Sequence, residues 1–225
     1  MKKTIIMSLG GSVIVPDKID VHFLKNFKKI INKYTGKGHK FAIICGGGRL
    51  ARDYQKAASE ISRQSNEYLD WLGIHATKMN AWFLKAIFGK DAERLIADDP
   101  RKKVNFSRKI LIAGGWKPGW STDYDAVLLA KNLNAKGIIN MSNVDYLYDK
   151  DPKKFKDAKK IKIISWKGYR RISGDKWKAG LNVPFDPIAA KEAEKSGLTV
   201  LVIGKNLGNF ENLLNGKKFE GTIIK

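Results

Sequence analysis

The sequence predicts an α/β fold with a largely parallel β-sheet covered by helices on both faces. Five short apolar segments are predicted to be buried strands, and most are followed by glycine and then by a segment with helical spacing. The composition agrees: 225 residues, of which 43% are hydrophobic and 29% charged, suffice for one large domain with a proper core or for two small domains.

The predicted strands and helices alternate along the chain. Strands are expected at 4–9, 41–45, 109–113, 137–141 and 199–203. Helices are expected at 21–34, 50–58, 68–88, 122–133 and 187–196. Residues 150–162 are predicted to be a charged loop and not a linker between domains. Because no internal repeat is visible either, we expect a single domain over 1–225.

Charge and cysteine content narrow the function classes. The formal net charge is +21, but lysines are spread along the whole chain, which favours a basic surface that attracts anionic substrates over a nucleic-acid-binding arm. Cys45 is the only cysteine, which excludes a disulfide framework and a cysteine-based metal site. The first residues run directly into a strand, with an apolar stretch too short for a signal peptide or a membrane span, so we expect a cytoplasmic protein.

Residues 41–52 form the most informative segment. An apolar strand ends in three glycines at 46–48, and a helix begins with Arg49 and Arg52 near its N-terminus. Free N–H groups, the positive end of a helix dipole and two guanidinium groups would converge there. This pattern predicts a phosphate site, and a tight turn without a ligand is the alternative.

Similar corners follow the other predicted strands. They lie at 10–12, 114–115 and 142–143, and the carboxyl ends of parallel strands meet at one edge of a sheet. We therefore expect a long site along that edge, suited to a large or double ligand. Neither a P-loop nor a Gly-x-Gly-x-x-Gly motif is present, so other loops must hold the phosphates, and Asp145 and Asp151 could organise Mg²⁺.

Two further features could contact a nucleotide. In the segment 116–123, a Pro-Gly turn precedes a Ser-Thr pair that can cap the next helix, and the tryptophans could border a planar base. The alternative is a capped helix with the tryptophans packed underneath. Asp70 could accept hydrogen bonds from a ribose or be an ordinary acid at a helix start, and Asp125 is interpreted as structural.

In order and spacing, these segments resemble the amino-acid-kinase superfamily, and within it the UMP kinases of the archaeal type. The matching segments span nearly the whole chain. They are 8–12, 46–52, 70–74, 76–81, 118–123, 143–145 with Tyr148, 151–152 and 186–191.

The resemblance implies a three-layer αβα sandwich with a mainly parallel central sheet. It implies phosphoryl transfer from ATP to UMP, giving UDP in pyrimidine nucleotide synthesis, with Mg²⁺ and usually as a homohexamer. An acceptor side would occupy roughly 1–135 and an ATP side roughly 136–225. Neither a membrane nor a nucleic acid is expected as a partner.

The resemblance also implies roles for single residues. Arg52 would be catalytic and would bridge the phosphates near the transferred group. The ATP-binding residues would be Gly11, Ser12, Gly48, Arg52, Ser142, Asn143, Tyr148 and Asp151. The UMP-binding residues would be Gly47, Asp70, Trp116, Lys117, Pro118, Gly119, Trp120, Ser121 and Thr122.

Departures from the family pattern keep other functions open. Ser8 stands where many members carry lysine, although archaeal-type UMP kinases often lack it too, and Lys78 stands where arginine is common. The loop 116–120 reads Trp-Lys-Pro-Gly-Trp, whereas the family more often has a threonine and histidines there. One alternative is another small phosphate acceptor, although the segment 46–52 lacks the histidine of isopentenyl phosphate kinases. A second is an inactive, basic regulator that binds nucleotides or nucleic acid.

Overall fold

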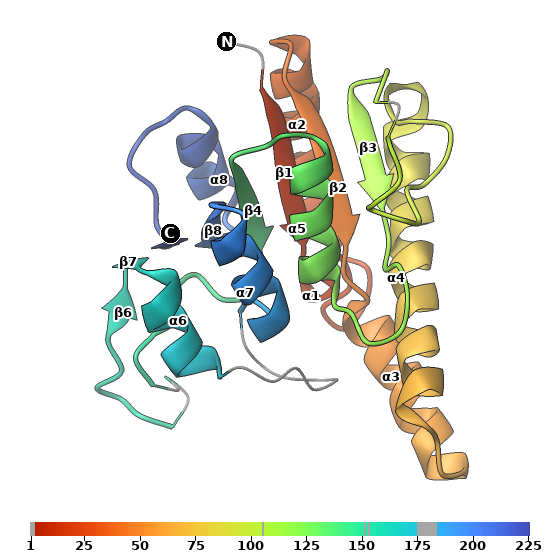
Figure 1. Cartoon of the computed structure of the whole chain (residues 1–225). Coiled ribbons are helices and arrows are strands. Elements are labelled where there is room, and N and C mark those ends of the chain that lie inside the picture. Colours follow the sequence, from red (N-terminus) through yellow and green to blue (C-terminus); the bar gives the residue numbers. More distant parts are fainter. Residues whose placement is uncertain (1–2, 105, 151, 153, 175–183) are drawn as a thin grey trace.

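The computed structural model describes residues 3–104, 106–150, 152, 154–174 and 184–225 and contains a seven-stranded, mainly parallel sheet (Figure 1). The strand order is β3-β2-β1-β4-β8-β9-β7. The strands are β1 (Thr4–Leu9), β2 (Lys40–Cys45), β3 (Ile110–Ala113), β4 (Gly137–Met141), β7 (Ile163–Ile164), β8 (Thr199–Ile203) and β9 (Thr222–Ile224). All neighbouring pairs are parallel except β8 and β9, which confirms the predicted sheet type.

Helices cover both faces of this sheet (Figure 1). They are α1 (Gly11–Ile14), α2 (Val21–Gly36), α3 (Gly48–Ile61), α4 (Asn66–Phe88), α5 (Thr122–Asn132), α6 (Trp166–Ser173), α7 (Pro187–Lys195) and α8 (Leu207–Leu214), with a 3-10 turn η1 (Gly89–Asp91). The five predicted helices are confirmed, with ends that differ by a few residues.

Two separate apolar clusters explain why the sheet has helices on each side. Alternate residues of a strand point to opposite faces. Met7 of β1 packs with α2, α4 and α8, whereas its neighbour Ile6 packs with α5, α6 and α7. The three-layer αβα architecture follows from this near-continuous apolar character of the central strands.

The region between β4 and α6 differs from the predicted charged loop. It contains a hairpin of β5 (Leu147–Tyr148) and β6 (Lys160–Ile161), with Leu147 paired to Ile161, and β7 follows. Each strand has only two residues, too few for an alternating pattern to be recognised. The prediction of an irregular segment is therefore wrong at 160–161.

The strand order reverses between β1 and β4, and we call this point the switch of the sheet. The chain proceeds from β1 outward through β2 to β3, then returns to the other side of β1 for β4 and continues to β8. Ligands in open parallel sheets bind at the carboxyl ends of the strands where the order reverses. The corners after β1, β2, β3 and β4 lie at that edge, as predicted. Within the described part of the chain, no helix has the length and apolar character needed to cross a bilayer.

Candidate functional site

The loops after β1 and β2 contact each other through glycine backbone. The N–H of Gly46 donates to the carbonyl of Leu9 at 2.9 Å. A Cβ added to Gly11 would lie 2.0 Å from the Gly48 nitrogen, and one added to Gly48 would lie 2.3 Å from the Gly11 oxygen. Gly48 also has a φ of +65°, which side-chain-bearing residues rarely adopt. Gly11 and Gly48 are therefore required by the contact between the two loops, a reason separate from the predicted phosphate site.

Helices α1 and α3 begin at this joint. The first N–H groups of a helix have no intrahelical acceptor, and those of Gly11, Ser12 and Gly48 belong to the first residues of α1 and α3. Gly47 precedes α3 and packs against Ala51. The predicted phosphate corner thus combines a rigid backbone joint with helix starts.

Helix α4 fastens the corners after β2 and β3 with two buried polar side chains. Asn80 donates from Nδ2 to the carbonyls of Gly46 at 2.8 Å and Gly47 at 3.2 Å. Thr77 Oγ1 accepts from the N–H of Gly115 at 2.6 Å. The sequence had assigned no role to either residue. Polar side chains on the buried face of an apolar helix need partners, and that pattern was the available signal.

Asp70 and the segment 116–122 come together as predicted. Asp70 Oδ2 accepts from the N–H of Gly119 at 2.8 Å, and Gly119 has a φ of +85° in the Pro-Gly turn. One carboxylate oxygen of Asp70 therefore fixes the tip of the loop. Lys78, on the same helix as Asp70, lies against Gly114.

The aromatic residues of this loop are half-buried instead of packed into the core. The Trp116 ring centroid lies 4.1 Å from the Arg101 guanidinium carbon and 4.5 Å from the Lys117 ammonium nitrogen. Trp120 stacks on Tyr124 with ring centroids 4.2 Å apart. Ser121 caps α5 by accepting from the N–H of Tyr124, so the capping part of the prediction is confirmed. Pro118 and Thr122 lie between these contacts at the turn and at the first position of α5.

Asp123 is a centre of hydrogen bonds at the switch of the sheet, a role the sequence did not reveal. Its Oδ1 accepts from Ser8 Oγ at 2.8 Å and from Asn140 Nδ2 at 3.1 Å, and its Oδ2 accepts from the N–H of Asp186 at 3.2 Å. Burial raises the pKa of Asp123 to about 7, although the hydrogen bond from Ser8 opposes the shift. Ser8, where many family members carry lysine, thus joins β1 to the start of α5.

The two arginines of α3 differ in their surroundings. Arg49 pairs with Asp53 at 2.6 Å and with Asp17 at 3.2 Å. Arg52 is exposed, and within the described residues no carboxylate forms an ion pair with it. Its guanidinium is therefore available for an anionic ligand, while that of Arg49 is engaged.

The predicted ATP side is held mainly by backbone. Gly10 donates to the Met141 carbonyl at 2.8 Å, and Ser142 donates to the Ile203 carbonyl at 3.0 Å. Asn143 is exposed, and Tyr148 is half-buried in β5. Asp151 lies outside the described residues.

The described residues contain no group of three or more His, Cys, Asp or Glu side chains arranged to hold a metal ion. Asp145 lies against Gly204, where an added Cβ would overlap its carboxylate. Such a set does not suit a protein cage for Mg²⁺, but it is compatible with an ion that keeps water and phosphate ligands.

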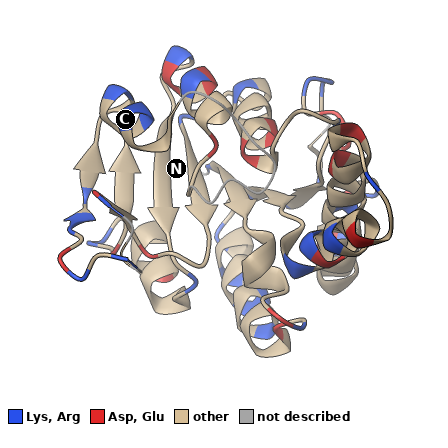
Figure 2. Cartoon of the chain, turned by 90° about the horizontal axis from the view of Figure 1, so that it is seen from below, with Lys and Arg blue, Asp and Glu red and all other residues tan. Residues whose placement is uncertain are grey.

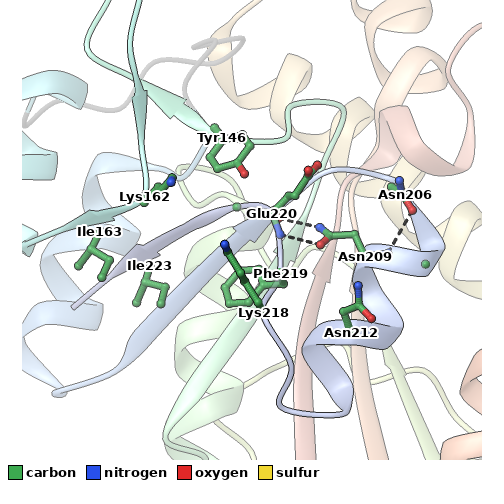
Figure 3. A pocket seen from close by; sticks show the side chains of 12 residues that line it. Tyr146, Lys162, Ile163, Asn206, Asn209, Asn212, Lys218, Phe219, Glu220 and Ile223 are labelled. Carbon is green, nitrogen blue, oxygen red and sulfur yellow. Dashed lines mark hydrogen bonds between the residues drawn. The ribbon is translucent and has the colours of Figure 1, made fainter.

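A cavity of about 810 Å³ lies between α8, β9 and the segment that joins them (Figure 3). Asn209 closes one wall through two hydrogen bonds with the backbone of Glu220, at 2.6 and 2.7 Å. Tyr146, Lys162 and Phe219 also line it. None of the predicted site residues does, so this cavity is separate from the candidate site.

Basic residues lie on the helices and loops of both helical layers and are mixed with acidic ones (Figure 2). That distribution agrees with a generally basic surface and differs from a single nucleic-acid-binding face.

Comparisons with known proteins agree with this geometry. Residues 3–204 match the model of the amino acid kinase family. The chain is 36% identical to the uridylate kinase of Thermoplasma volcanium over 228 residues, covering 100% of this chain and 99% of the relative. It is 38% identical to that of Thermococcus sibiricus over 225 residues, covering 98% and 99%.

Solved structures give the same result. Uridylate kinase from Archaeoglobus fulgidus superposes with a TM-score of 0.82 at 30% identity, covering 100% of both chains. UMP kinase from Bacillus anthracis shares the fold, with a TM-score of 0.78 at 21% identity over 100% of this chain and 96% of that one. The match over residues 3–204 and the full-length relatives establish that the chain belongs to the amino acid kinase family.

Proposed function

We propose that this protein is a UMP kinase that transfers the γ-phosphoryl group of ATP to a phosphate oxygen of UMP, giving UDP and ADP in pyrimidine nucleotide synthesis. The observation that carries the proposal is the acceptor loop 116–122, tied to Asp70 of α4 at 2.8 Å, in a chain that is similar over its full length to uridylate kinases.

The two substrates would meet at the glycine joint. UMP would lie against Gly47, Asp70 and the loop 116–122. ATP would lie across the switch of the sheet, with its phosphates near Gly11, Ser12 and Gly48 and its nucleoside near Ser142, Asn143, Tyr148 and Asp151. The joint between Gly11 and Gly48 supports this arrangement, because it holds the two loops at one distance. A single sheet joins both sides, which supports one domain over 1–225.

The chemistry would rest on charge stabilisation and not on a base. The phosphate of UMP is already largely ionised at neutral pH, so the acceptor oxygen needs no proton removed. Phosphoryl transfer depends on positioning and on neutralising the charge of the transferred group. Arg52, which pairs with no carboxylate of the described residues, and the N–H groups at the helix starts would supply that neutralisation, and Mg²⁺ would contribute positive charge on the ATP phosphates.

A homo-oligomer is also proposed. One face of α4 carries large apolar side chains that point away from the body of the protein: Tyr68 is 67% exposed, Met79 63% and Trp82 51%. A helix that is apolar on its outer face as well as its inner one is expected to be covered, and such patches mark interaction sites. We propose that α4 packs on α4 of a second copy. The hexamer that the family resemblance implies would need a second interface, since a two-fold contact alone gives a dimer.

Introducing negative charge on the outer face of α4 tests the proposed oligomer. Met79→Glu with Trp82→Glu should convert the protein to a monomer in light-scattering measurements, because carboxylates cannot be desolvated in an apolar contact. Lys25→Glu, an exposed charge reversal on α2, is the control and should leave the mass unchanged. An unchanged mass in the double variant would contradict the proposed surface.

A panel of acceptors tests the proposed reaction. ADP formation from ATP is followed with UMP, other nucleoside monophosphates and small phosphates such as isopentenyl phosphate. UMP is expected to give the highest kcat/KM, with UDP as the product. Preference for another compound would keep the kinase but change its substrate. Absence of transfer to every acceptor, with salt-sensitive binding of RNA or DNA, would instead favour the inactive regulator.

A further inference from the structure

We propose that Arg101 is a positioning residue of the acceptor site: it holds the indole of Trp116 from outside, while Asp125 holds the main chain of Trp116 from within. The inference rests on the proposed function, because that proposal assigns Trp116 to the acceptor. It adds a residue from the segment between α4 and β3, which lies outside all of the motifs discussed above.

The outer contact is made by the guanidinium of Arg101, whose side chain is 59% exposed and is held along one edge by Asp99. Arg101 Nε and Nη2 donate to the two carboxylate oxygens of Asp99 at 3.1 and 3.0 Å, and the Arg101 N–H donates to Asp99 Oδ1 at 3.0 Å. The Asp99 side chain is 11% exposed, so this acceptor is itself well anchored. Arg101 lowers the pKa of Asp99, which keeps the carboxylate ionised.

A planar guanidinium held by such a fork can stack on an aromatic ring. The guanidinium carbon of Arg101 lies 4.1 Å from the centroid of Trp116. The indole therefore packs against a guanidinium that is bound at two points to Asp99. Lys117, whose ammonium lies 4.5 Å from the same centroid, has no comparable anchor among the described residues.

The inner contact is a buried carboxylate. Asp125 is 1% exposed, and its Oδ2 accepts from the N–H of Trp116 at 3.1 Å. Its Oδ1 has no hydrogen-bond partner in the described structure, and the residue lines a small internal space together with Ala97 and Pro100. The inner and outer contacts thus come from parts of the chain that pack against each other.

The segment that carries Arg101 is attached to the helix that carries Asp125. Asn132, at the end of α5, donates from Nδ2 to the carbonyl of Pro100 at 3.1 Å. Backbone pairing of Ala97 with Ala113 attaches the same segment to β3. Trp116 therefore lies between two supports that are joined to each other, and removing either one is expected to loosen the start of the acceptor loop.

The first test is the kinetic split in Arg101 variants. Arg101→Ala should raise the KM for UMP about three- to tenfold, the range that corresponds to a lost cation–π contact, and change kcat and the KM for ATP less than about twofold. Arg101→Lys should recover only part of the loss, because an ammonium cannot form the fork with Asp99. Arg94→Ala, an exposed cation on the same segment, is the matched control and should leave all three parameters unchanged.

A double-mutant cycle with Trp116→Leu shows whether Arg101 acts through the indole. Trp116→Leu alone should raise the KM for UMP. Adding Arg101→Ala should raise it no further, because the partner ring is already absent. An equal rise in both backgrounds would overturn the inference, as would an unchanged KM in Arg101→Ala or an equal rise in the KM for ATP. If Arg101→Ala does not fold, Asp99→Asn breaks the fork and carries the same expectation.

The wild-type protein separates this inference from the proposed function. Transfer to UMP by the wild type, with no effect of Arg101→Ala, rejects the inference alone. If the wild type prefers another acceptor, the same comparison is made with that compound. If it transfers to none, the dissociation constant for UMP is measured by calorimetry in both proteins: weaker binding by Arg101→Ala supports the inference, and equal or absent binding overturns it.

Discussion

The acceptor side and the donor side of the candidate site are held together in different ways. On the acceptor side, side chains of α4 and α5 bind loop backbone: Asn80, Thr77, Asp70 and Asp125 each contact a different loop position. On the donor side, backbone groups bind each other, as between Gly10 and Met141. Substitutions should therefore have graded effects on the acceptor side, where a side chain can be trimmed, and abrupt effects at the donor-side glycines, where a side chain can only be added.

Arg52, between the two sides, should give the largest effect on catalysis. Arg52→Ala is expected to lower kcat/KM by about 2–4 kcal/mol of transition-state stabilisation, because a charge facing the transferred group is lost. Steady-state kinetics with UMP and ATP measure it. Arg49→Ala is the matched control and should change the rate little, since exposed ion pairs contribute about 0–1 kcal/mol. Near-wild-type turnover of Arg52→Ala would remove this residue from the mechanism.

Gly11→Ala should break the joint between the two sides. The new Cβ would lie 2.0 Å from backbone nitrogen, which cannot move without shifting the loop after β2. We expect a loss of about 3 kcal/mol in the free energy of unfolding, measured in urea. Gly36→Ala, at a glycine with nothing within 4 Å of the added Cβ, is the control and should be neutral or slightly stabilising. Equal stability of the two variants would mean that the loops separate easily.

Asp70 tests the graded behaviour expected of the acceptor side. Asp70→Ala should raise the KM for UMP about five- to thirtyfold, which corresponds to about 1–2 kcal/mol. The N–H of Gly119 loses its acceptor, and the loop tip is released. Asp70→Asn keeps a carbonyl acceptor and should cost less. Glu67→Gln, on the first turn of the same helix, is the control. If Asp70→Ala leaves the acceptor KM unchanged, Asp70 is only an acid at a helix start.

The pH dependence of stability should expose Asp123, where the two sides meet. Its pKa is about 7 in the folded protein, above the value of about 4 expected when unfolded, so the folded state binds more protons between these limits. Asp123 therefore stabilises the fold fully below about pH 4, and this contribution is lost as the pH rises toward 7.

Asp123→Asn should make the free energy of unfolding fall less steeply with pH, by up to about 1 kcal/mol per pH unit. The substitution also places an amide against the N–H of Asp186, but the cost of that contact does not depend on pH and does not change the slope. Urea unfolding at pH 5, 6 and 7 measures the slope. Asp157→Asn, an exposed carboxylate, is the control. Identical slopes in the wild type and Asp123→Asn would show that Asp123 does not titrate in this range.

Most of the central fold could be predicted from sequence because its signals are local. Strand β2 carries an unbroken apolar run over 41–45, and helices such as α2 place their apolar residues at helical spacing. The short strands β5, β6, β7 and β9 have two or three residues each and depend on their partners: β5 pairs with β6 in the hairpin, and β7 pairs with β9 far along the chain. Helix α1, with four residues, is likewise too short for a periodic signal.

The site could be predicted only where one segment carries the evidence. The corners that follow the strands, Asp70 and the loop 116–122 do come together. Asp123 and Arg101 were missed because their significance comes from Ser8, Asn140 and Trp116, which are far away in sequence. The role of Arg52 and the nucleotide-binding roles of single residues stay predictions.

The backbone contact between Gly11 and Gly48 has a consequence for how the two nucleotides could influence each other. A flexible side chain between the loops could absorb a displacement, but main-chain atoms in direct contact transmit it. If ATP shifts the β1 loop by a fraction of an ångström, the start of α3, and with it Arg52, must follow. Thermodynamic linkage then requires reciprocity: if bound ATP changes the affinity for UMP by some factor, bound UMP changes the affinity for ATP by the same factor.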